Sequence, residues 1–158
     1  MSKEVSTLLN YAYFYLRFRP RTESEIRQYL IKKAKKFSYG GDIIDATVAD
    51  LKKQTLIDDT KFVTWFVELK GSSAKKSRSM MSFQLMRHGV PQEIISAYFE
   101  DNEVDEMKNC RSALASQWRR FEKVEKRKRF EKAAAFLQRK GFSYGTIKRA
   151  IAEKEEKE

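Results

Sequence analysis

The stretch Leu137–Ile147 (LQRKGFSYGTI) decides the fold, because the chain carries two similar stretches earlier in its sequence. Leu85–Ile95 reads LMRHGVPQEII, and Leu30 is followed by a basic segment and then by Phe37–Ile44, FSYGGDII. Aligned on the leucine, the copies are 55 and 52 residues apart. The second column of the alignment holds Phe37, Val90 and Phe142, at spacings of 53 and 52 residues. A period of about 50 residues is typical of a tandem array rather than of one compact core.

Each copy is predicted to contain three helices, because apolar residues recur at helical spacing and no stretch alternates for long enough to favour a strand. We therefore expect an all-α protein, an elongated tandem array of three three-helix modules. The predicted modules are residues 1–57, 58–103 and 104–158, the last with a charged tail from residue 153 that we expect to fray. A module of this size is marginal alone, so neighbours should share apolar contacts. The aromatic residues nearest the junctions are Trp65, Tyr98 and Trp118.

Local signals predict where the helices begin and end. Thr22–Glu25 (TESE) is a capping box, in which the threonine oxygen and the last glutamate each satisfy a backbone N–H of the first turn. Three further residues are expected to begin helices as N-caps: Asp42, Asp58 and Ser143. Two glycines are expected to end helices: Gly89 and Gly141. In the third module, the middle helix is predicted to carry an apolar face that starts at Phe121.

Composition narrows the class of protein. No apolar run approaches the roughly 18 residues that a membrane span requires, and Met1–Glu4 does not open a signal peptide. The single cysteine, Cys110, excludes an internal disulfide and fits a reducing cytoplasm. We therefore expect a soluble cytoplasmic protein without a membrane partner.

The formal net charge of +11 is unevenly distributed. The three predicted modules carry net charges of +5, −1 and +7 in chain order. Basic ends around a near-neutral middle indicate contact with an anionic partner at two separated places. The alternative is that the lysines and arginines only solvate helix surfaces.

Three groups of cations are the candidate contact residues for a partner protein or DNA. The densest group contains Arg119, Arg120, Lys123, Lys126, Arg127, Lys128, Arg129, Lys132, Arg139 and Lys140. The second contains Lys32, Lys33, Lys35 and Lys36, of which the last two could instead stabilise a helix C-terminus. The third lies in a glycine-containing loop and contains Lys70, Lys75, Lys76 and Arg78.

Four segments, in the same order across almost the whole chain, resemble motifs of the RecX family, the regulators of the RecA recombinase. Arg21–Leu30 (RTESEIRQYL) is similar to the family's R-S-x-x-E-L-x-x-K-L, and Leu56–Val63 (LIDDTKFV) to x-I-D-D-x-R-F-A. Lys70-Gly71, followed by the copy at Leu85–Ile95, resembles R-x-K-G-x(n)-E-L-x-x-K-G-V-x-x-x-x-I. Phe136–Tyr144 (FLQRKGFSY) is similar to F-L-x-R-R-G-F-S-Y. The chain departs from the pattern at Lys70 and at Gln84, where arginine and an acidic residue are usual.

The resemblance implies a non-enzymatic modulator of RecA that needs no cofactor. Such proteins are elongated arrays that lie in the helical groove of the RecA filament on single-stranded DNA. There they mostly inhibit ATP hydrolysis, strand exchange and co-protease activity. By this resemblance we expect a monomer whose partners are the RecA filament and, within it, single-stranded DNA.

Two alternatives stay open from the residues alone. The chain could be a general basic DNA-binding protein that acts without RecA. A sequence-specific helix–turn–helix reader, with Gly89–Pro91 as its turn, is less consistent because the cation excess lies outside the middle module. Cations directed at phosphates bind DNA with little base preference.

Catalytic and metal-binding residues find little support. His88 is the only histidine and is expected beside a helix end, and Cys110 has no adjacent basic partner that would activate its thiol. Asp58 and Asp59 are explained by capping. No phosphate-binding loop, dinucleotide turn or zinc-ligand cluster is present in the sequence.

Overall fold

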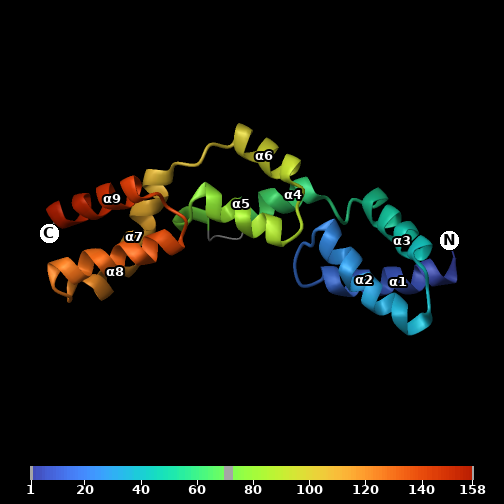
Figure 1. Ribbon diagram of the computed structural model, residues 1–158. Coiled ribbons are helices and arrows are strands. Elements are labelled where there is room, and N and C mark those ends of the chain that lie inside the picture. The colour runs from blue at the N-terminus through green and yellow to red at the C-terminus, as the bar shows by residue number, and fades with distance from the viewer. Residues whose placement is uncertain (1, 70–72, 158) are drawn as a thin grey trace. The chain divides into compact units, whose positions relative to one another are not determined.

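The computed structural model describes residues 2–69 and 73–157, and within these ranges the chain is helical with no β-strand (Figure 1). The described residues form nine α-helices, so the prediction of an all-α protein is confirmed. The first five α-helices are α1 (Lys3–Leu16), α2 (Glu23–Phe37), α3 (Gly41–Lys53), α4 (Asp59–Thr64) and α5 (Arg78–Arg87). The other four are α6 (Gln92–Asp101), α7 (Glu106–Glu122), α8 (Lys126–Arg139) and α9 (Tyr144–Glu156). A π-helical turn, Trp65–Leu69, continues α4, and a 3₁₀ turn, Ser73–Lys75, precedes α5.

The chain divides into two compact units. The first unit contains residues 1–66 and 85–98, and the second contains residues 67–84 and 99–158. The division into modules at residues 57 and 103 stays a prediction.

The core of the first unit lies among α1, α2 and α3. Leu8, Ile26, Leu30 and Leu51 are fully buried there. Burying an aliphatic side chain of this size contributes about 1.5–3 kcal/mol, which explains why α1 and α2 keep an apolar stripe on the inward face. Thr47, also buried, donates its hydroxyl to the carbonyl oxygen of Ile43, 2.8 Å away, so its polar atom is satisfied.

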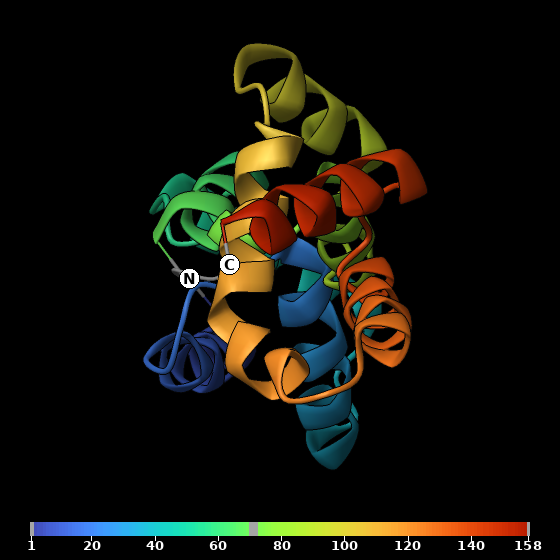
Figure 2. The same ribbon diagram turned by 90° about the vertical axis from the view of Figure 1, so that its left-hand side faces the viewer.

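The core of the second unit lies among α7, α8 and α9, the orange-to-red helices of Figure 2. Leu114, Leu137, Ile147 and Ile151 are buried in it. Trp118, one of the aromatic residues near a predicted junction, is 5% exposed and packs in this core.

The middle helix of each copy ends in the same way. The N–H of Val90 donates to the carbonyl of Leu85, and the N–H of Phe142 donates to the carbonyl of Leu137. This is the hydrogen bond of a Schellman motif, with Gly89 at φ +87° and Gly141 at φ +94° in the left-handed position.

The first copy shows that the alignment on Phe37 was wrong by two residues. Its equivalent bond runs from the N–H of Tyr39 to the carbonyl of Ala34, with Ser38 in the left-handed position at φ 59°. The residues that occupy equivalent positions in the three copies are therefore Tyr39, Val90 and Phe142, at spacings of 51 and 52 residues. The alignment was misled because both Phe37 and Tyr39 are aromatic.

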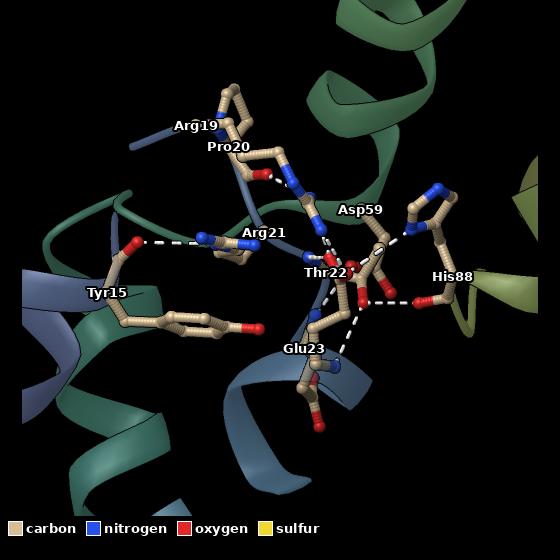
Figure 3. A network of polar contacts seen from close by, with 9 residues as sticks. Tyr15, Arg19, Pro20, Arg21, Thr22, Glu23, Asp59 and His88 are labelled. Atoms are coloured by element: carbon tan, nitrogen blue, oxygen red, sulfur yellow. Dashed lines mark hydrogen bonds and ion pairs between the residues drawn. The ribbon is translucent and has the colours of Figure 1, made fainter. Parts of the chain in front are cut away.

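Each of the two glycine turns packs against the start of the preceding copy's middle helix. A Cβ atom on Gly89 would lie 2.4 Å from Cβ of Ser24, and one on Gly141 would lie 2.2 Å from Oγ of Ser77. The hydroxyl of Thr22 donates to the carbonyl of His88 at 2.6 Å, as Figure 3 shows. We call these two contacts the glycine joints; one lies in each unit.

Most predicted helix starts are confirmed. The capping box at Thr22 and Glu25 is complete, and Asp58 and Ser143 accept backbone N–H bonds as N-caps. The prediction for Asp42 was wrong: Gly40 is the N-cap of α3, and Asp42 lies in the first turn.

Two boundaries in the third copy also differ from prediction. Phe121 lies in α7, not in the following helix, which begins at Lys126. The tail predicted to fray is helical through Glu156. Glu153 pairs with Arg111 at 2.8 Å, and Glu155 pairs with Arg129 at 2.8 Å, so two of the tail's carboxylates are tied to α7 and α8.

Candidate functional site

The turn between α7 and α8 gathers most of the densest cation group. Arg119 and Arg120 lie in the last turn of α7, and Lys123 is its C-cap residue. Lys126, Arg127 and Lys128 then begin α8. All six side chains are exposed. We call this set the turn cluster.

The cations at the start of α8 oppose the helix's own electrostatics. The N-terminus of a helix carries a partial positive charge and favours acidic residues in its first turn. The first turn of α8 contains no acidic residue, and its N-cap, Glu125, makes no side-chain capping bond. An anionic partner at this end would meet both the cationic side chains and the helix terminus.

Arg129 belongs to the same sequence run but is held inside the second unit. Its side chain is 17% exposed, and its Nε donates to Oε1 of Glu155 at 2.8 Å. Nη1 donates to the carbonyl of Glu122 at 3.3 Å, and the guanidinium carbon lies 5.8 Å from the ring centroid of Trp118. These contacts assign Arg129 to the stability of the unit rather than to an exposed surface.

The remaining cations of the densest group spread along α8. Lys132 is exposed and lies one turn after Lys128. Arg139 ends the helix, about 20 Å from its start at 1.5 Å per residue. The group that the sequence presents as one band is therefore divided between the two ends of a helix.

The glycine joint of the second unit brings a separate loop to the far end of α8. The N–H of Ser77 donates to the carbonyl of Lys140 at 3.2 Å, and the hydroxyl of Ser79 donates to the carbonyl of Gly141 at 3.3 Å. The joint therefore places the start of α5 next to the end of α8. The cations carried by these two neighbouring segments are Lys75, Lys76, Arg78, Arg139 and Lys140, which we call the joint cluster. Lys70, predicted with them, lies outside the described residues.

Two members of the joint cluster are oriented by neighbours. Nζ of Lys76 donates to Oε1 of Gln84 at 2.9 Å. The guanidinium carbon of Arg78 lies 5.3 Å from the ring centroid of Phe99, close enough for a cation–π contact. The sequence predicted both groups of cations but gave no reason to join them.

The predicted lysines of the first unit lie on the second half of α2. Lys35 and Lys36 stand in its last turn, where they stabilise the negative end of the helix, and Lys32 is exposed. Lys33 differs, because its ammonium lies 5.1 Å from the ring centroid of Tyr11 and 5.3 Å from that of Tyr29.

Lys33 lines a surface groove between α1 and α2 that sequence reasoning missed. The groove has a volume of about 460 Å³ and is lined by Thr7, Asn10, Tyr11, Phe14, Tyr29 and Lys33. Three of its lining residues are aromatic, Tyr11 and Phe14 from α1 and Tyr29 from α2. The available signal was that α1 carries more aromatic residues than one buried stripe can hold.

The residues considered for catalysis have structural roles. Cys110 is buried, and burial raises the pKa of its thiol to about 11, so it stays protonated at neutral pH. Nδ1 of His88 lies 3.3 Å from Oε2 of Glu25, and its ring packs 5.5 Å from that of Phe62. Asp59 accepts the N–H of Glu23 at 2.9 Å. Within residues 2–69 and 73–157, no group of three or more potential ligands could hold a metal ion.

None of the helices formed by the described residues is long and apolar enough to cross a membrane. The helix with the most apolar residues, α1, is amphipathic and packs in the core of the first unit.

Comparison with known proteins identifies relatives of the chain. Residues 9–51 match the family model described as RecX, first three-helix domain, and residues 103–151 match RecX, third three-helix domain. A protein of Geobacillus kaustophilus named Regulatory protein RecX is 29% identical over 157 residues, covering 95% of this chain and 55% of that protein. One of the same name from Streptococcus mutans is 26% identical, covering 85% of this chain and 50% of that protein. The chain thus spans about half the length of these relatives.

Solved structures agree with the fold. The crystal structure of RecX from Lactobacillus salivarius superposes with a TM-score of 0.74 at 22% identity and covers 97% of both chains. A second structure, titled crystal structure of regulatory protein RecX, has a TM-score of 0.70 at 20% identity, covering 94% of this chain and 72% of that one. At these identities the likeness concerns the fold. Together with the two family domains in their proper order, it shows that the chain belongs to the RecX family.

Proposed function

We propose that this protein is a non-enzymatic regulator that binds RecA filaments on single-stranded DNA and mostly inhibits them. Family membership and the name Regulatory protein RecX, carried by relatives across most of this chain, support a regulatory role. The chain spans about half the length of those relatives, so its RecA partner and its inhibitory effect are part of the proposal.

The observation that carries the proposal is the turn cluster. Six exposed cations lie around one helix–helix turn, in a position where three of them oppose the dipole of α8. A surface that only needed solvation would gain stability from acidic residues there. The cations at this helix start are explained by an anionic partner, such as acidic protein groups or DNA phosphates in a nucleoprotein filament.

The second unit offers the filament two points of contact. The turn cluster and the joint cluster lie at opposite ends of α8, about 20 Å apart. A polymer of identical subunits presents repeated sites, and a ligand that contacts two of them gains through effective concentration. Single-stranded DNA is the second partner that we propose, within the filament.

The test is the DNA-stimulated ATPase activity of RecA with purified protein added at substoichiometric amounts. Inhibition, together with cosedimentation of the protein with filaments, is the expected result. Unchanged hydrolysis without cosedimentation would overturn the proposal.

The alternative function, a general DNA-binding protein without a role for RecA, is favoured only by the turn cluster's fit to phosphates. It predicts tight binding to bare DNA, no effect on RecA at protein levels too low to coat the strand, and a steep dependence on salt. For single strands, the log–log slope is about −0.7 for each phosphate neutralised.

A further inference from the structure

The groove between α1 and α2 lies in the unit of the chain that does not contain the turn or joint cluster. Five of the ten exposed large hydrophobic residues in the described part of the chain come from α1, α2 and the turn that joins them. They are Tyr13, Phe14, Phe18, Ile31 and Phe37. Four of the five are aromatic, and exposed apolar side chains that gather on one surface are typical of interaction sites.

Aromatic rings lie exposed along α1 and in the turn that follows it. Tyr11 and Phe14 are three residues apart on one face of the helix, and Phe18 lies in the turn after its end. Phe14 is 53% exposed and Phe18 is 67% exposed, and their rings meet edge to face with centroids 5.3 Å apart. An exposed ring such as that of Phe14 can receive an unpaired base of an extended strand.

Lysine and arginine side chains make cation–π contacts with these rings. The ammonium of Lys33 lies over Tyr11 and Tyr29, and the guanidinium carbon of Arg17 lies 5.9 Å from the ring centroid of Phe14. None of the described residues that line the groove carries a carboxylate. Burial raises the pKa of Tyr29, so this ring stays uncharged and does not repel an anion.

The surface continues past Tyr29 into a second recess. Tyr15 stacks on Tyr29 with centroids 4.1 Å apart and an interplanar angle of 3°, and the guanidinium of Arg21 lies 3.7 Å from the centroid of Tyr15. Figure 3 shows Arg21 beside Tyr15, whose carbonyl it also contacts. Beyond this stack lies a recess of about 210 Å³, whose lining contains Lys32 and Arg87 and also the carboxylate of Glu25, which is paired with Arg19. The cationic, carboxylate-free part of the surface is therefore the groove itself.

We propose that the α1–α2 groove is a binding site for single-stranded nucleic acid, in which unpaired bases stack on Tyr11 and Phe14 while Lys33 contacts the backbone phosphates. Non-specific binding to single strands combines these two features, a cationic groove and exposed aromatic faces. Asn10 adds an exposed side-chain amide at its edge, whereas the hydroxyl of Thr7 already donates to the carbonyl of Lys3 at 3.0 Å. This site does not rest on the proposed regulation of RecA, since it is tested without RecA.

The test uses fluorescence anisotropy of a labelled oligothymidylate with purified protein. Phe14→Leu keeps an apolar side chain at an exposed helical position but removes the ring, and it should weaken binding by about 5- to 100-fold. Phe83→Leu removes an equally exposed phenylalanine outside the groove and should change binding by less than about twofold. Circular dichroism establishes that both variants are folded.

A second oligomer separates the contribution of base stacking to the binding affinity from the contribution of charge. An abasic oligomer of the same length keeps every phosphate but has no base, so wild type and Phe14→Leu should bind it equally. Lys33→Gln should weaken binding to both oligomers and lower the salt slope by about 0.7.

Two results would overturn the site. One is full affinity of folded Phe14→Leu for oligothymidylate; if that variant also lost inhibition of RecA, the groove would hold a protein segment instead. The other is an equal loss of affinity on the abasic oligomer, which would exclude stacking. Failure of the RecA assay with normal oligonucleotide binding would leave this site intact and overturn only the proposed function.

Discussion

At the scale of single residues, glycine is required where one copy of the repeat touches the one before it. Gly89 and Gly141 combine a left-handed backbone with a neighbour that a Cβ atom would strike. Ser38 has the same backbone conformation at the end of α2 but is exposed. A side chain is tolerated there because Ser38 faces solvent.

Gly141→Ala is therefore expected to destabilise the protein by about 2–3 kcal/mol. Left-handed backbone costs a non-glycine residue about 1–2 kcal/mol, and the clash with Oγ of Ser77, 2.2 Å from the added Cβ, adds to it. Ser38→Gly, the matched change in the opposite direction, should leave stability unchanged or raise it by up to about 1 kcal/mol. Urea unfolding followed by circular dichroism measures both. Equal stability of wild type and Gly141→Ala would contradict the requirement for glycine at this joint.

A second residue-scale prediction concerns pH. Burial by itself would raise the pKa of Glu25, but hydrogen bonds from Arg19, from the backbone of Thr22 and from His88 outweigh it and lower that pKa below its usual value. The stability that Glu25 contributes is therefore present above the unfolded pKa of about 4.3 and is lost as pH falls through the lower, folded value.

Glu25→Gln should accordingly unfold more easily than wild type at neutral pH, and the difference should shrink as pH falls below about 4. Thermal unfolding at a series of pH values measures it. Glu4→Gln, a change at a partly exposed glutamate in the first turn of α1, serves as control. A gap between Glu25→Gln and wild type that stays constant down to the lowest pH would refute this linkage.

At the scale of one element, the charges at the start of α8 lower the stability of the helix but suit an anionic partner. Its first turn holds cations where acidic residues are favoured, while its far end meets the start of α5 through the glycine joint. The periodicity of the sequence predicts the helix, and its charge run predicts a surface. Only the packing of α7 and α9 shows that Arg129 turns inward to Glu155.

Lys126→Glu should therefore move two measurements in opposite directions. The new carboxylate at the start of α8 should stabilise the protein by about 0.3–1 kcal/mol, because it complements the helix dipole. The same change should weaken inhibition of RecA by removing a cation from the turn cluster. Lys108→Glu, in the first turn of α7, should give a similar stabilisation with inhibition unchanged. Loss of stability in Lys126→Glu would refute the electrostatic account of this helix.

At the scale of the whole molecule, the net charge of +11 does not by itself locate a surface. Charge reversal within the turn cluster, Arg127→Glu with Lys128→Glu, should greatly weaken both cosedimentation with filaments and inhibition of the ATPase. It should also make the remaining binding less sensitive to salt, since fewer ion contacts are lost as salt rises.

The matched control is Lys108→Glu with Lys148→Glu, which changes the net charge equally at two exposed lysines outside both clusters. This variant should inhibit nearly as well as wild type. If both double variants lost inhibition equally, total charge rather than the turn cluster would govern binding.

The sequence by itself determined the helical class, the capping box at Thr22, the glycine stops and the approximate period of the repeat. These features follow from contacts within a few residues, such as a side-chain oxygen meeting a backbone N–H three positions later. Family motifs in the correct order could also be identified without any structure.

Only the tertiary structure decided which of these local pieces meet. The contacts of Thr22 with His88 and of Ser77 with Lys140 join residues more than 60 positions apart, and no local pattern specifies such a pairing. The same long-range packing divided one run of cations into two clusters and left the aromatic groove of α1 and α2 open. Burial depends on which faces other helices cover, and that is a property of the folded units rather than of a segment.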